Sequence, residues 1–157
     1  MLIGVTLYFL PSSPRRLRIC GLKKRSTDKA RVLQPPGSMN EQAEALKRRT
    51  KQFALDCIAL VRTFPSGEPA WTVGTQLTKA ATSVGANYRA ACRARSRAEF
   101  VAKVGLVEEE ADESGFWLEI GRETQLGPAK VIDPLIREAD ELTAIFARST
   151  MTARSHP

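Results

Sequence analysis

The sequence predicts an all-α protein, an antiparallel up-down-up-down four-helix bundle with a disordered N-terminal extension. Apolar residues recur at spacings of three and four through four segments after residue 39, which is the period of amphipathic helices. Proline and glycine separate these segments, and no alternating strand pattern or Asn-Gly hairpin turn occurs. Helices joined by short loops pack as antiparallel neighbours. A chain of 157 residues has room for one such core.

The first two helices are expected over residues 40–64 and 70–94. The first has an apolar face formed by Leu46, Phe53, Cys57, Leu60 and Phe64. The loop from Pro65 to Pro69 ends this helix, because proline removes a backbone donor. The second has a stripe of mostly small residues: Leu77, Ala80, Ala81, Val84, Tyr88 and Ala91. Together with Gly85, this stripe favours close approach of a neighbouring helix.

The third helix is expected to open at Ser96, because Glu99 follows three residues later as in a capping box. Its stripe alternates spacings of four and three, which is typical of left-handed helix packing: Phe100, Val104, Val107, Ala111, Ser114 and Leu118. Gly127-Pro128 then breaks the chain. We expect Asp133 as the N-cap and Pro134 as the first residue of the fourth helix. The stripe of that helix is Leu135, Ala139, Leu142 and Phe146.

The positive charge is concentrated in residues 1–38. The whole chain has a formal net charge of +7. Residues 1–38 contain eight basic residues and one acidic residue, so residues 39–157 are neutral overall. The segment is rich in Pro, Ser, Lys and Arg without a sustained apolar period, which is typical of disorder. We therefore divide the chain into a basic leader (1–38), a bundle (39–152) and a tail (153–157).

Three interpretations of residues 1–38 stay open. The segment is a flexible leader, or a basic arm for nucleic acid or lipid, or it is not part of the native protein. We favour the last, with translation starting at Met39, because the helical pattern begins there after Pro35-Pro36-Gly37-Ser38. A secretory signal is not expected, because the short apolar run 1–10 precedes the basic residues instead of following them.

Composition argues against most enzyme and metal classes. The only histidine is His156, next to the C-terminus, so a Ser-His-Asp or Cys-His arrangement is not expected. Cys20, Cys57 and Cys92 are far apart, which indicates free thiols in a reducing cytoplasm and no zinc site. No phosphate-binding glycine loop and no apolar run of membrane-spanning length occurs. We expect no catalytic residues, no metal, no cofactor and no membrane association.

Four arginines gather where the second helix meets the third. They are the candidate nucleic-acid-binding residues: Arg89, Arg93, Arg95 and Arg97. If the second helix persists through them, Arg89 and Arg93 share a face and bind phosphate. The alternative is a solvated or salt-bridged helix end, where cations also suit the helix dipole. Tyr88 and Trp117 are candidate base-stacking aromatics, but aromatics at helical spacing are more typical of a core.

The third helix is rich in carboxylates, with acidic residues at 108–110 and 112–113. Such groups can serve acid–base chemistry or bind divalent metal. A di-iron bundle site needs Glu-x-x-His pairs, and these four segments contain no histidine. We expect the acids to pair with cations of the second helix or of a neighbouring subunit.

The stretch 82–119 resembles the four helix bundle protein family, also called the 23S ribosomal RNA intervening-sequence protein family. The resemblance covers about residues 46–147 and rests on an ordered set of residues: Ser83, Val84, Asn87, Arg89, Arg93, Arg95, Ser96, Glu99, Phe100, Glu109, Asp112 and Glu113. One departure is that many members have Asn-Ile-Ala-Glu-Gly where this chain has Asn87-Tyr88-Arg89-Ala90-Ala91.

The resemblance implies an antiparallel four-helix bundle that assembles into a homo-oligomer, typically a pentameric ring. It also implies contact with RNA or a nucleic-acid-processing protein, because a relative binds RNA and reverse transcriptase in diversity-generating retroelements. The resemblance implies no catalytic residues in this chain. We expect a non-enzymatic scaffold or adaptor, with an RNA-binding protein as the alternative. The candidate oligomer interface is Asn87, Arg93, Glu109, Asp112 and Glu113, with Arg89 and Arg97 beside Arg93 on the basic surface.

Overall fold

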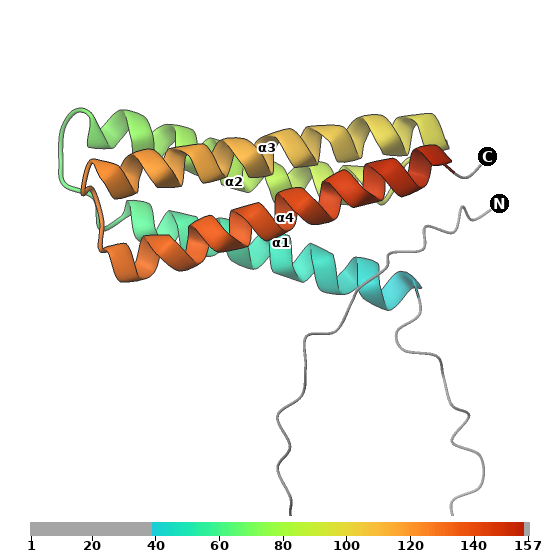
Figure 1. Ribbon diagram of the computed structural model, residues 1–157, viewed down its shortest axis with the longest axis horizontal. Coiled ribbons are helices and arrows are strands. Elements are labelled where there is room, and N and C mark those ends of the chain that lie inside the picture. Colours follow the sequence, from blue (N-terminus) through green and yellow to red (C-terminus); the bar gives the residue numbers. More distant parts are fainter. Residues whose placement is uncertain (1–38, 156–157) are drawn as a thin grey trace, which may run out of the picture.

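A computed structural model describes residues 39–155, and within them the chain forms four helices and no strand. They are α1 (Met39–Val61), α2 (Ala70–Ala91), α3 (Arg97–Glu123) and α4 (Ala129–Ser155). Successive helices run in opposite directions, so that α1 and α3 point the same way (Figure 1). The expected up-down-up-down bundle is confirmed. The expectations for residues 1–38 lie outside the described residues, and α4 continues three residues into the stretch expected as a tail.

The core contains the apolar stripes that the sequence predicts. Phe53, Leu77, Val104 and Phe146 are at most 2% exposed, one from each helix. Phe146 packs against Tyr88, with ring centroids 5.3 Å apart. Tyr88 is therefore a core residue, as expected, and Trp117 packs against the same core while partly exposed. Burial of these side chains supplies the main driving force for folding.

The capping box of α3 is confirmed with one difference. The Ser96 hydroxyl accepts a hydrogen bond from the Glu99 backbone N–H at 3.1 Å. The Glu99 carboxylate reaches back to the backbone N–H of Arg95 at 2.8 Å, one residue before the cap. Both bonds satisfy donors that would otherwise lack partners at the start of a helix.

The start of α4 differs from the prediction. The helix begins at Ala129, so Asp133 is not its N-cap and Pro134 lies inside the helix. The first turn packs onto the core through Ile132, which is fully buried. This burial outweighs the single hydrogen bond that Pro134 removes in the second turn. The Asp133 carboxylate instead accepts a hydrogen bond from Nε of Arg122 on α3, at 2.8 Å.

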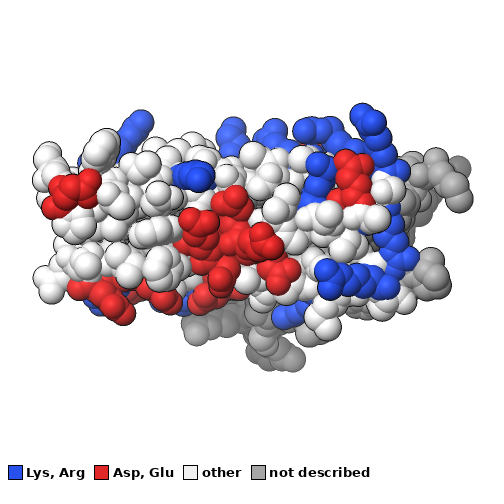
Figure 2. All heavy atoms as spheres, turned by 90° about the horizontal axis from the view of Figure 1, so that it is seen from above, with Lys and Arg blue, Asp and Glu red and all other residues white. Residues whose placement is uncertain are grey.

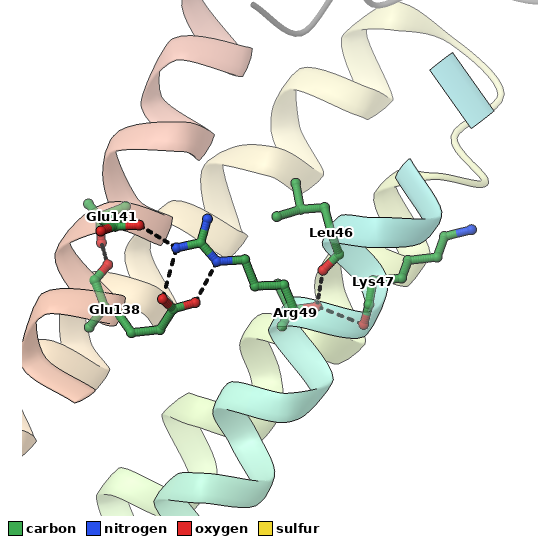
Figure 3. A network of polar contacts seen from close by, with 8 residues as sticks. Leu46, Lys47, Arg49, Glu138 and Glu141 are labelled. Carbon is green, nitrogen blue, oxygen red and sulfur yellow. Dashed lines mark hydrogen bonds and ion pairs between the residues drawn. The ribbon is translucent and has the colours of Figure 1, made fainter. Parts of the chain in front are cut away.

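Helix α1 is the least tightly packed of the four. It packs mainly against α2 and makes far less contact with α4. The N-terminal end of α1 diverges from the C-terminal end of α4 (Figure 1). Arg49 bridges the two helices where they separate, because its guanidinium contacts both Glu138 and Glu141 (Figure 3). Between α1 and α4, ion pairs of Arg49 therefore supplement the limited apolar packing.

Candidate functional site

Three arginines surround the turn between α2 and α3, and we call them the arginine turn: Arg89, Arg93 and Arg95. All three side chains are exposed, and none forms an ion pair with another described residue. Figure 2 shows basic side chains gathered toward one end of the molecule. The second helix was expected to reach residue 94, but α2 ends at Ala91, so Arg93 lies beyond it and the helical face that Arg89 and Arg93 would share does not form. Arg93 lies in the turn, three residues before Ser96.

Arg97 has a different environment from the arginine turn. Its Nε donates a hydrogen bond to the backbone carbonyl of Ala153 in the last turn of α4. Its Nη2 is buried. The last carbonyls of a helix lack partners within the helix and carry partial negative charge, so a cation there stabilises the helix end. Arg97 therefore joins α3 to the end of α4, and this contact separates it from the other three arginines.

The third helix carries what we call the α3 acidic face: Glu109, Asp112 and Glu113. These side chains are exposed, and Glu108 and Glu110 beside them are half-buried. Figure 2 shows acidic side chains gathered in the middle of one side of the bundle. The expected ion pairs with cations of α2 do not form, because no described cation lies within 4 Å of these acids. Glu113 instead accepts a hydrogen bond from Nε1 of Trp117 at 3.1 Å.

Burial and neighbouring carboxylates both disfavour the charged form of Glu110. Partial burial raises the pKa of Glu110 above its ordinary value, and the neighbouring carboxylates of Glu113 and Glu109 raise it further. Lys79 on α2 acts in the opposite direction without cancelling these effects. Lys79 therefore compensates only part of the negative charge around Glu110.

Two large apolar side chains flank the α3 acidic face. Leu106 is 49% exposed and Phe116 is 51% exposed. Together with Glu109 and Glu113 they follow spacings of three, four and three, so they lie on one face of the helix. This exposed pair is not among the residues predicted from the sequence. The signal that could have found it is a second apolar repeat, out of phase with the stripe that enters the core.

The remaining predicted residues are distributed as follows. Asn87 is half-buried on α2, and Cys57 is fully buried while Cys92 packs at the edge of the core. No group of three or more His, Cys, Asp or Glu within residues 39–155 is arranged to hold a metal ion. At the end of the bundle opposite the arginine turn, an open groove that was not predicted from the sequence is bordered by Phe64, Glu68 and the 74% exposed Trp71.

No helix of the described part of the chain is long and apolar enough to cross a membrane. Against known families, the model of the 23S rRNA-intervening sequence protein matches residues 43–148. The chain belongs to this family. The match covers all of α1, α2 and α3 except the first four residues of α1, and most of α4. The resemblance inferred from the ordered set of residues around Asn87 and Ser96 is thereby confirmed.

A solved structure shares the fold of this member of the 23S rRNA-intervening sequence family. It is a protein of unknown function from the S23 ribosomal protein family of Bacteroides thetaiotaomicron, with a TM-score of 0.64 and 24% sequence identity. The similarity covers 70% of this chain and 98% of the other. Curated proteins contain no match to the chain. At this identity the comparison establishes the architecture.

Proposed function

We propose that the protein is a non-enzymatic scaffold or adaptor that assembles with copies of itself through the α3 acidic face. The observation that carries this proposal is a set of three exposed carboxylates without a cationic partner among the described residues, flanked by the exposed Leu106 and Phe116. Apolar side chains beside uncompensated charge are typical of an interaction surface that needs a basic partner.

A second copy of the chain can supply that basic partner. In a cyclic assembly, one surface of each subunit contacts a different surface of its neighbour. This bundle has separate acidic and basic surfaces, although residues 39–157 have no net charge. The family resemblance supports a homo-oligomer. We propose that it contains five subunits arranged in a ring. The proposed compartment is the cytoplasm, where three widely separated cysteines stay reduced.

Light scattering on the full-length chain tests the proposal. We expect a mass that is a multiple of the 17.3 kDa of one chain. The variant Glu109→Gln/Asp112→Asn/Glu113→Gln keeps the shape of the surface and removes its charge, so we expect a smaller mass. A matched control is Glu119→Gln/Glu123→Gln near the end of the same helix, which should leave the mass unchanged. A wild-type mass of one chain at micromolar concentration would refute self-assembly.

RNA binding through the arginine turn is the second candidate function. Arg89, Arg93 and Arg95 are exposed, lack ion-pair partners among the described residues and lie at or next to the turn between α2 and α3. Cations in such an arrangement bind phosphates in a salt-dependent manner. We expect the triple variant Arg89→Gln/Arg93→Gln/Arg95→Gln to lose affinity for a structured RNA in a fluorescence titration at low salt. Equal affinity of this variant and the wild type would exclude the arginine turn.

A further inference from the structure

A basic run in α1 contains two cations that form no ion pair with a described residue of the bundle. Lys47 pairs with Glu44 at 2.7 Å, and Arg49 pairs with Glu138 and Glu141. Arg48 and Lys51 lie in the same run, are exposed, and form no ion pair with a described residue. One turn after Lys51, Leu55 is 48% exposed. Arg48, Lys51 and Leu55 therefore form an unpartnered surface, which we call the α1 basic strip.

The α1 basic strip and the outer face of α3 have the same spacing. Lys51 and Leu55 follow Arg48 by three and seven residues, and Asp112 and Phe116 follow Glu109 by three and seven residues. These intervals correspond to about 4.5 Å and 10.5 Å along a helix. Two helices laid side by side in the same direction thus place two cations opposite two carboxylates and one exposed apolar side chain opposite another.

Direction and height in the bundle agree with this pairing. Helices α1 and α3 run the same way (Figure 1), and rotation about an axis parallel to the bundle preserves both direction and height. The backbone of Thr50 lies against Gly85 of α2, and Val73, twelve residues earlier on α2, lies against Gly121 of α3. Twelve residues before Gly121 is Glu109. Thr50 and Glu109 are therefore at about the same height, so the α1 basic strip begins level with the α3 acidic face.

We propose that the α1 basic strip of one subunit docks in parallel on the outer face of α3 of a second copy. Arg48 then faces Glu109, Lys51 faces Asp112, and Leu55 packs against Phe116. This inference rests on the proposed self-assembly and adds the identity of its basic surface. It assigns that surface to α1 and leaves the arginine turn outside the interface. Charge complementarity of this kind fixes the register and suppresses alternative pairings.

A charge-swap experiment on the full-length chain tests the pairing. Arg48→Glu/Lys51→Glu should lower the mass of the assembly, measured by light scattering, to or toward that of one chain, and Glu109→Lys/Asp112→Lys should do the same. Combining all four changes restores opposite charges at both positions, so we expect the larger mass to return. Far-ultraviolet circular dichroism identifies any variant that fails to fold, and all four side chains are exposed.

The matched control reverses two cations of the arginine turn. Arg89→Glu/Arg93→Glu should leave the mass of the assembly unchanged. If this variant dissociates while Arg48→Glu/Lys51→Glu does not, the pairing through α1 is wrong and self-assembly through the α3 acidic face still stands. If the combined variant stays dissociated although each parent is folded, the register is wrong. A wild-type chain that is a monomer would refute self-assembly itself, and the pairing with it.

Discussion

The guanidinium of Arg49 on α1 contacts both carboxylate oxygens of Glu138 on α4, with Nε at 2.6 Å and Nη2 at 2.8 Å (Figure 3). Both side chains are less than a third exposed. The pair joins α1 and α4, the two neighbouring helices of the bundle that make the least contact with each other. Two parallel charge-assisted hydrogen bonds fix the separation of these helices as well as adding stability.

Glu138→Gln should destabilise the bundle by about 1–2 kcal/mol, because one charge-assisted bond is lost and Arg49 stays partly buried. The measurement is urea unfolding followed by circular dichroism at a fixed protein concentration. Glu44→Gln is the control, since Glu44 pairs with Lys47 on the same exposed helix surface and contributes little. If both substitutions lower the free energy of unfolding equally, the bridge between α1 and α4 contributes no more than an exposed ion pair.

Two glycines of α2 should respond differently to substitution by alanine. A Cβ at Gly85 would lie 3.6 Å from the Thr50 carbonyl oxygen, which is an ordinary contact. Gly85→Ala should therefore stabilise the protein by up to about 1 kcal/mol through helix propensity. A Cβ at Gly74 would lie 2.8 Å from Cγ1 of Val61, so Gly74→Ala forces a shift and should be less stable than Gly85→Ala. Thermal unfolding of both variants gives the comparison, and the reverse order would contradict this packing.

Cys57 should resist alkylation in the folded protein. Burial raises the pKa of its thiol to about 12, with a smaller effect from Asp56, so almost no thiolate exists at pH 8. Iodoacetamide should modify Cys57 only when urea unfolds the chain. Peptide mass mapping distinguishes Cys57 from Cys20 and Cys92. Modification of Cys57 at the same rate with and without urea would place it outside the core.

Glu110 should contribute more favourably to the stability of the bundle in acid than at neutral pH. Its pKa is raised in the folded state by partial burial and by Glu113, so the folded protein holds this proton more tightly than the unfolded chain does. The resulting stabilisation is present below the ordinary pKa of glutamate and is lost as pH rises through the raised pKa.

Glu110→Gln should therefore raise stability slightly at pH 7, by less than about 0.5 kcal/mol for a group that is only partly buried. The advantage should disappear below pH 4, where the wild-type carboxyl is protonated. Urea unfolding at both pH values tests this. A variant less stable than the wild type at pH 7 would mean that Glu110 has a favourable partner.

The core was predictable from the sequence because each helix enters it through one stripe with helical spacing. Leu77, Val84 and Tyr88 keep their predicted places in spite of the shifted helix ends. The ends themselves depend on tertiary packing. The N-cap pattern of Asp133 and Pro134 predicted that α4 starts there. The helix instead begins at Ala129, because this places Ile132 in the core.

The candidate surfaces were only partly predictable. The sequence shows which residues are charged, and the exposed positions of Glu109, Asp112 and Glu113 follow from their phase relative to Val107 and Ala111. Which cations are already used depends on contacts between distant segments. Arg49 and Glu138 are separated by 89 residues, and Arg97 reaches Ala153 at the end of another helix. Only the packed bundle shows that Arg48 and Lys51 lack such partners among the described residues.

The most direct measurement is the mass of the full-length chain by light scattering as salt rises from about 50 mM to 1 M. Ionic contacts between exposed groups weaken as the Debye length falls. We expect a multiple of 17.3 kDa at low salt that decreases toward the mass of one chain as salt increases. A mass of one chain at every salt concentration would contradict self-assembly, and an assembly that does not weaken with salt would contradict the charged interface.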